Sequence, residues 1–147
     1  MSCASPVTQL VAVVETDLSV PDQITALRVR TLRADADVEE ELSSQTVMLG
    51  ASSDFPVAVA VEPFDLMDIG RVVVEVEAQS ATGLRVVAQR AATEFRSGQV
   101  LALPMSLSSG CRRVMCPTGS TCAEMGCRSQ EVAVDSLVSF EGALDAP

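Results

Sequence analysis

Short runs in which valine and other apolar residues alternate with polar ones follow one another along the chain as far as Leu107. A period of two is typical of strands, because successive strand side chains point to opposite faces. Clusters of Pro, Gly, Ser and Asp separate the runs, as expected for turns. The pattern predicts about seven strands: 10–15, 24–32, 46–49, 57–61, 71–79, one that begins at 84, and 99–107.

The alternation also predicts which strand faces are buried. The run 10–15 is apolar on both sides, so we expect it to be covered on both faces. In the run 24–32, Arg28 and Arg30 alternate with apolar residues and form a basic stripe with Arg33. We interpret this stripe as an outward strand face. The alternative is a surface that receives an acidic partner or the acidic tail of the chain itself.

The clearest pattern is a hairpin that begins with the run 71–79. Valines fill one face of this run, and Glu75 and Glu77 lie on the other, which we expect to be wet. A short connection that contains glycine follows, as hairpins require. The next strand is expected to face inward at Leu84, Val86 and Ala88.

These elements indicate an all-β fold. About seven strands with regular turn signals and no amphipathic helix are typical of an antiparallel β-sandwich, immunoglobulin-like or transthyretin-like, with the strand order left open. We assign residues 8–108 to the sandwich and residues 1–7 to an N-terminal linker. Residues 109–128 form a small Cys-rich module. Residues 129–147 are an acidic tail that forms either a flexible arm or an extra strand.

Four of the five cysteines lie close together, in the pattern Cys-x4-Cys-x5-Cys-x4-Cys. The segment around them is rich in turn residues and too polar to form a core, so we predict that two disulfides hold it. Of the three possible pairings we predict the crossed one, as in many small knot-like modules. A four-thiolate zinc site is the alternative, but neither pair has the tight Cys-x2-Cys spacing. The four residues are Cys111, Cys116, Cys122 and Cys127.

Cys3 stands apart from this cluster. It follows a small residue and precedes a short polar stretch and the first strand, which is how a mature bacterial lipoprotein begins. The apolar residues of a lipobox are missing upstream, and the first residues do not form a signal peptide. Cys3 is therefore a possible lipid anchor, and a free surface thiol is the alternative.

Three stretches together carry a resemblance: residues 8–18, the strand end 103–105, and the Cys-rich residues 111–127. They resemble the secreted or lipid-anchored β-domain proteins of myxobacteria and related GC-rich bacteria. The Cys-rich tail is the most specific part. The resemblance implies a cell-surface address and carries over no catalytic residue.

Composition excludes several function classes. The formal net charge is −10, which argues against nucleic acid and against anionic membranes. The chain has no His, Lys, Trp or Tyr. Acyl-transfer and Cys-His mechanisms therefore lack their base, and a glycosidase pair of carboxylates lacks the aromatic platform for a sugar. We expect no enzymatic activity and no cofactor.

The polar stretch 34–41 is expected to be a connection between strands. Its carboxylates, Asp35, Asp37 and Glu39 first among them, are calcium candidates, because Ca²⁺ prefers oxygen ligands. The stretch lacks the glycine of an EF-hand loop, and we favour a solvated charged loop. Asp65 and Asp68 are weaker candidates of the same kind.

The sequence as a whole predicts a non-catalytic extracytoplasmic surface protein, a structural or partner-binding β-sandwich. The alternative is a self-assembling fibre or coat subunit that polymerises by edge-strand addition through its C-terminal arm. We expect a protein partner or self-assembly, no nucleic acid, and membrane attachment only through a lipid on Cys3.

Overall fold

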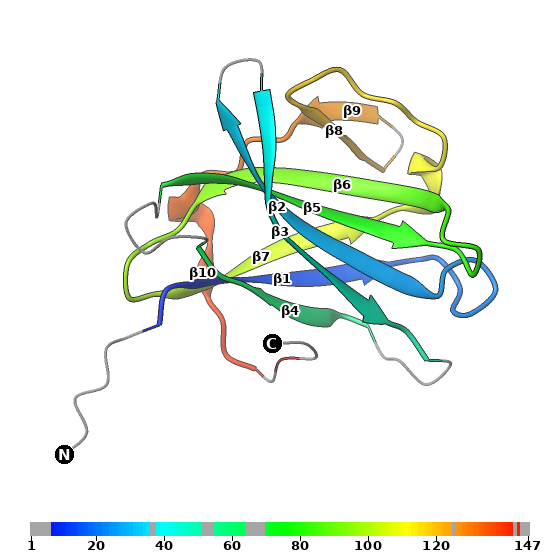
Figure 1. The fold of residues 1–147 in the computed structure, drawn as a ribbon, viewed down its shortest axis with the longest axis horizontal. Helices are drawn as coiled ribbons and strands as arrows, with labels where there is room; N and C mark the ends of the chain where they lie inside the picture. Colours follow the sequence, from blue (N-terminus) through cyan, green and yellow to red (C-terminus); the bar gives the residue numbers. More distant parts are fainter. Residues whose placement is uncertain are drawn as a thin grey trace.

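The computed structural model describes residues 7–35, 38–50, 55–63, 70–124, 126–142 and 144, without the side chains of 34, 35 and 38. Within those ranges the fold is nearly all β (Figure 1). The strands are β1 Gln9–Thr16, β2 Ala26–Asp35, β3 Val38–Met48, β4 Val57–Val61, β5 Arg71–Gln79, β6 Arg85–Glu94, β7 Val100–Leu107, β8 Ser120–Ala123, β9 Gly126–Ser129 and β10 Val138–Ser139. Two 3-10 turns, η1 Ser109–Cys111 and η2 Val134–Ser136, complete the elements. In these ranges no helix has the length and apolarity needed to cross a membrane.

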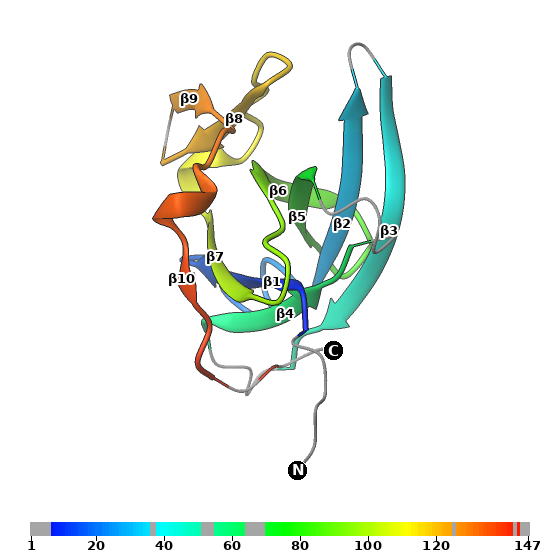
Figure 2. The same ribbon diagram turned by 90° about the vertical axis from the view of Figure 1, so that its left-hand side faces the viewer.

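Two four-stranded sheets face each other, as Figure 2 shows. Sheet A has the order β10-β7-β1-β4, sheet B has the order β3-β2-β5-β6, and β8 and β9 form a separate small ribbon. The predicted all-β sandwich is confirmed, and its seven expected strands correspond to β1 through β7. Neighbouring strands pair antiparallel except β1 and β7, which are parallel.

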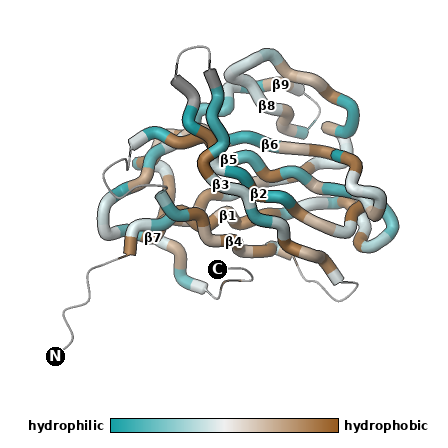
Figure 3. The backbone as a smooth tube through the Cα atoms, in the orientation of Figure 1, coloured by the Kyte–Doolittle hydropathy of each residue, from teal (hydrophilic) through white to brown (hydrophobic). Residues whose placement is uncertain are grey.

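The core lies between the two sheets and is built from the inward residues of both. The hydropathy colouring of Figure 3 shows β1 and β4 as largely apolar and β2 and β5 as alternating. In β7 the predicted inward face is confirmed, and all four of its members are buried. Val11, on the opposite face of β1, is also fully buried, as expected for a strand covered on both sides. The β7 residues are Leu101, Leu103, Met105 and Leu107.

The expectation of a loop over 34–41 is wrong. Strand β2 continues to Asp35 and β3 begins at Val38, so Glu39, Glu40 and Glu41 are strand residues. Glutamate is depleted in strands, which is why its cluster looked like a connection. The long β2–β3 hairpin extends past the sandwich and crosses over β6 in the view of Figure 1.

The expected inward face of β6 is also wrong. Ala78 pairs with Val87 and Gln79 with Arg85, so Val86 is an extra residue in a β-bulge. One extra residue exchanges the two faces of everything that follows it. Ala88 is consequently half-buried, while Val87 and Ala91 join the core. Val86 itself still packs against the core, and Leu84, which precedes the bulge, is exposed at the end of the hairpin.

The Cys-rich segment closes the open edge of sheet B. The crossed pairing is confirmed, with disulfides Cys111–Cys122 and Cys116–Cys127. The outer backbone edge of β6 is paired by this region: the amide of Arg90 donates to Thr121 Oγ1 at 2.9 Å, and the amide of Ala92 donates to the carbonyl of Gln130 at 2.8 Å. Because Cys111 and Cys122 belong to the same core cluster as the strands, the segment shares the sandwich core.

The C-terminal segment lies along sheet A. Val138 and Ser139 pair with β7 as a two-residue strand, so one of the two predicted arrangements, the extra strand, applies to these residues. Val132, Val134 and Leu137 are half-buried against the core.

The bulge yields a test that uses one chemical change at adjacent positions. Val87→Ala removes buried methyl groups and should lower the free energy of unfolding by about 2 kcal/mol. Val86→Ala, at the bulge, should cost at most about half as much, because this side chain is only partly buried. Urea denaturation of both variants measures the difference. A larger cost at Val86 would contradict the register described above.

Candidate functional site

The outer face of sheet B, which points away from sheet A, carries charges whose sign alternates from strand to strand. Glutamates lie on β3, arginines on β2, glutamates on β5 and arginines on β6. In the strand register, Glu75 lies between Arg30 of β2 and Arg90 of β6. Opposite charges on neighbouring strands stabilise a sheet through cross-strand pairs. This arrangement makes the face a connected network of ion pairs.

Glu75 is the centre of this network. Its side chain is only 4% exposed, so the expectation of a wet face here is wrong. Arg30 donates to Glu75 Oε1 through Nε at 3.0 Å and through Nη2, and Arg85 Nη2 lies 3.3 Å from Oε2. Arg90 Nε lies 3.3 Å from the same oxygen without forming a hydrogen bond of good geometry. A carboxylate is tolerated at this depth because three guanidinium groups surround it.

The glutamates of β3 hold the outer ends of the same arginines. Glu41 Oε1 lies 3.1 Å from Arg28 and 3.4 Å from Arg30. Glu39 reaches across from the β2–β3 hairpin and accepts from Arg90 Nη2 at 2.6 Å. Arg28 and Arg30 of the predicted basic stripe therefore face outward, as expected, and the carboxylates that meet them come from β3 and β5. The inclusion of Arg33 in this stripe is wrong, because β2 has no extra residue after Arg30 and Arg33 therefore lies on the opposite face, where it pairs with Glu40 at 3.8 Å.

The pKa of Arg30 reflects this arrangement. Partial burial alone lowers it, because burial disfavours the charged form. The hydrogen bonds and Coulombic attraction of Glu75 and Glu41 outweigh that effect, so the pKa is raised above its ordinary value. Arg30 is therefore charged at neutral pH.

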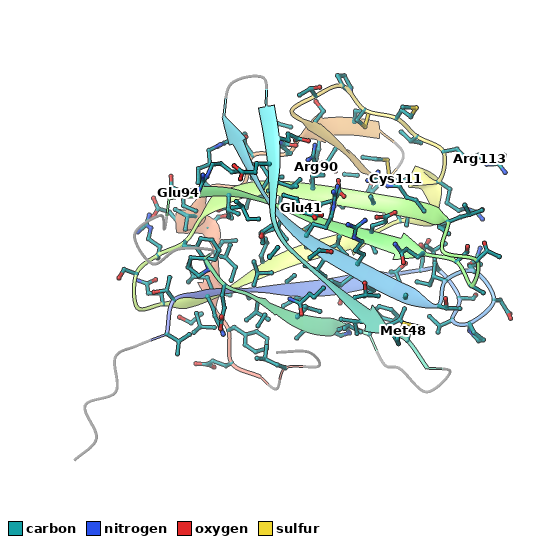
Figure 4. All side chains as sticks on the ribbon, viewed as in Figure 1. Glu41, Met48, Arg90, Glu94, Cys111 and Arg113 are labelled. Carbon is teal, nitrogen blue, oxygen red and sulfur yellow. A yellow bond between two sulfur atoms is a disulfide. The ribbon has the colours of Figure 1, made fainter. Side chains whose placement is uncertain are left out.

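A groove of about 510 Å³ lies beside this network, between β6 and residues 112–119, which we call the groove loop. The β6 side contributes Arg85, Val87 and Arg90, and the groove loop contributes Arg113 and Met115, among others. Figure 4 shows Arg90 and Cys111 on the side of β6 nearest β8, with Arg113 farther out along the groove loop. The disulfides hold the groove loop at both ends.

The groove is electropositive on a protein that is acidic overall. Its charged lining consists of three arginines and one glutamate, Glu75, which leaves an excess of two positive charges. Arg113 has no ion-pair or hydrogen-bond partner among the residues that the structure describes. Among the described residues Arg85 has a single ion pair, to Glu75, and its side chain is 52% exposed. Unsatisfied guanidinium groups at a concave surface are suited to carboxylates.

The rim of the groove is apolar. Met115 is 93% exposed, and Val114 beside it is also exposed. Leu84, which precedes the groove-lining Arg85, is 68% exposed. Single exposed apolar side chains are ordinary, but three around one concave surface are typical of a contact site. Methionine in particular adapts its shape to different partners.

Asp17 anchors the base of the groove loop. Its carboxylate accepts from the Ser109 hydroxyl and from the Ser109 amide, both at 2.7 Å. These bonds favour the charged form and lower the pKa of Asp17 below its ordinary value, with a smaller Coulombic contribution from Arg112. The turn η1, which begins at Ser109, is thereby tied to the end of β1.

The other predicted site residues do not form a site in the described structure. Cys3 and Asp37 lie outside the described residues, as do Asp65, Asp68 and the side chain of Asp35. Glu39 is engaged by Arg90. Across the described ranges, no group of three or more His, Cys, Asp or Glu residues is placed to hold a metal ion.

Sequence reasoning missed the arginines that line the groove. Arg85 and Arg90 lie on β6, where the unrecognised bulge concealed which side chains point outward. Arg113 lies in a segment without period-two alternation. Its φ of 63°, in the left-handed region that favours glycine, leaves no trace in the sequence. The alternation of charge sign between neighbouring strands predicts the ion-pair network only when the register of the strands is known.

The ion-pair network predicts a large effect at its centre. Glu75→Gln leaves three arginines without their shared carboxylate, and it should lower the free energy of unfolding by about 3 kcal/mol. Glu77→Gln is the matched control, since Glu77 is on the same strand and face and is also buried, but has no ion pair within the described ranges, and it should cost less than about 1 kcal/mol. Urea denaturation at neutral pH measures both. Equal costs would show that Glu75 does not hold the network together.

Asp17 predicts a pH-dependent contribution to stability. Because its pKa is lowered in the folded protein, the charged form is favoured by folding, and the contribution is fully present above the unfolded value of about 3.9. It is lost as the pH falls through the lower folded value. Asp17→Asn should therefore cost about 1 kcal/mol at pH 6, and the difference from the native protein should disappear in acid. Urea midpoints of both proteins across this range measure it, and a difference independent of pH would contradict the assignment.

Comparisons with known proteins do not assign this arrangement. No protein-family model matches the chain, and neither the curated proteins nor the solved structures contain a match. The ion-pair network and the groove are accordingly the features that bear on function.

Proposed function

We propose that the chain is a non-catalytic, cell-surface or secreted β-sandwich that binds a protein partner at the groove between β6 and the groove loop. The observation that carries this proposal is the combination of an electropositive groove with an exposed apolar rim. Contact sites between proteins commonly combine apolar anchors with arginine.

The compartment follows from the disulfides. Two disulfides indicate an oxidising, extracytoplasmic environment, because cytosolic thiols are kept reduced. Attachment through a lipid on Cys3 is part of this proposal.

The absence of catalysis is supported by the chemistry of the groove. Its hydroxyl groups, those of Thr118, Ser120 and Thr121, have no His or Lys in the chain to act as their base. Its one carboxylate, Glu75, is held by arginines. These groups are suited to binding rather than to proton transfer.

Self-assembly by edge-strand addition is the second candidate, and it has less support. Val138 and Ser139, which an arm of this kind would donate, already pair with β7 of the same chain. The outer edge of β6 is covered, and the edge strand β3 carries Glu39, Glu40 and Glu41. Charged residues on an edge strand oppose pairing with another chain.

Site-specific crosslinking in intact cells of the source organism tests the proposal. A photoreactive amino acid at Met115 should give one discrete covalent adduct with another protein, because this side chain stands at the rim of the groove. The same amino acid at Val138, which is 69% exposed on β10, should give none. Gel mobility and mass spectrometry identify the adducts.

Each of the other outcomes has a definite meaning. An adduct of twice the chain mass at Val138, with none at Met115, would favour self-assembly through the C-terminal segment. No adduct at either position would contradict partner binding. Alkylation of the same cells reports the compartment: four modified thiols in the Cys-rich segment would contradict an extracytoplasmic location.

A further inference from the structure

The three arginines of the groove differ in the number of ion pairs that they form with other residues of the described structure. Arg90 is held by Glu39 at 2.6 Å and lies beside Glu75, so it forms part of the groove's fixed surface. Arg85 has one contact to the shared carboxylate, and Arg113 has none within the described ranges. Two guanidinium groups are thus available to a ligand.

We propose that the groove binds a peptide segment of the partner that is acidic and contains an aliphatic residue such as leucine. Arg113 and Arg85 hold the carboxylates of this segment. The inference rests on the proposed function and names the chemical class of the partner. A guanidinium presents a planar pair of N–H donors that matches a carboxylate in a bidentate arrangement. The neighbouring Met115 and Val114 provide contact for an aliphatic side chain of the same segment.

A net charge of −10 does not prevent an acidic segment from binding here. At physiological ionic strength, exposed charges farther apart than about 8 Å are largely screened from one another. The segment therefore responds mainly to the groove lining, in which positive charge is in excess. The acidic remainder of the surface slows the approach more than it weakens the bound state.

A peptide fits the groove better than a sugar or a nucleic acid does. Sugar sites and single-strand nucleic-acid sites rely on the flat faces of aromatic side chains. The chain has no Trp or Tyr, and none of the three phenylalanines that the structure describes lines the groove. Its apolar rim consists of aliphatic and sulfur-containing side chains, which suit the side chains of a peptide.

The groove loop is formed before the ligand arrives. The two disulfides close it, and Asp17 ties its base to β1. Arg113 has a φ of 63°, a backbone conformation at which glycine would be less strained. An arginine at that position directs a cation to the rim at a cost in backbone energy. A loop ordered in advance does not lose further entropy on binding, which strengthens the complex.

Fluorescence anisotropy with a defined peptide tests the inference. The probe is a short fluorescein-labelled peptide rich in glutamate and containing leucine, with two counterparts in which glutamine or lysine replaces every glutamate. The glutamate peptide should bind the oxidised full chain, and both counterparts should bind at least about tenfold more weakly. Competition by dextran sulfate at equal charge concentration should be weaker than competition by the unlabelled peptide.

Variants locate the binding. Arg113→Glu and Arg85→Glu should each weaken binding of the glutamate peptide at least about tenfold. Arg128→Glu is the matched control, since it makes the same charge change at an exposed arginine of β9 that is outside the groove lining and has no ion pair within the described ranges, and it should weaken binding by less than about threefold. Arg113→Lys keeps the charge without the bidentate geometry and should fall between the native protein and Arg113→Glu. A single cooperative unfolding transition well above the assay temperature shows that each variant is folded.

The results that would overturn the inference are distinct from those that would overturn the proposed function. Equal binding of the glutamine peptide would mean an apolar site, and stronger competition by dextran sulfate would mean a polyanion site. Equal loss with Arg128→Glu would mean a diffuse electrostatic effect. If the glutamate peptide does not bind while the Met115 adduct forms in cells, the partner is of another class and the proposed function stands.

Discussion

Burial of the Cys111–Cys122 disulfide against the sandwich is the constraint on which the rest of the structure depends. Both residues are only 5% exposed and belong to the core cluster shared by the two sheets. The segment between them is too polar to collapse alone, and the bond restricts its unfolded conformations. The segment can therefore lie along β6 and satisfy backbone groups that an open edge would leave unpaired. Without this cover, sheet B would end in an exposed edge strand.

The same constraint places the groove beside the ion-pair network. The outer face of β6 presents Arg85 and Arg90, and the segment that covers its edge brings Arg113 to the opposite wall. Arg90 belongs to both arrangements, because it approaches Glu75 and Glu39 and also lines the groove. The position of Arg90 in the groove is thus set by contacts that also stabilise the fold. Only the outer arginines remain free to respond to a ligand.

The part of this arrangement that is predictable from the sequence is the part that depends on local pattern. The bounds of β5 and the buried face of β7 were predicted because alternation is a local feature, and the clustering of four cysteines indicated two disulfides. The crossed pairing was chosen by analogy with small knot-like modules. The face of β6 was not, because one inserted residue at Val86 reverses it without disturbing the local composition.

The prediction that Glu39, Glu40 and Glu41 lie in a loop was wrong for a related reason. Glutamates in succession are typical of a solvated loop, and they are stable in a strand here because arginines of other strands face them. Glu75 is buried for the same reason, since the charges that compensate it come from both neighbouring strands. Pairing between distant segments decides these positions, and a single sequence does not record that pairing.

The two disulfides differ in their position and in their burial. Cys111–Cys122 is part of the core, so its sulfur atoms pack like apolar side chains and contribute to the stability of the sandwich. Cys116–Cys127 lies farther out, with Cys116 half-buried and Cys127 exposed. It joins the groove loop to β9 and so fixes the outer wall of the groove. Cys111 and Cys122 also line the groove, so the buried bond serves both the core and the groove, and the outer bond adds a second link to the groove wall.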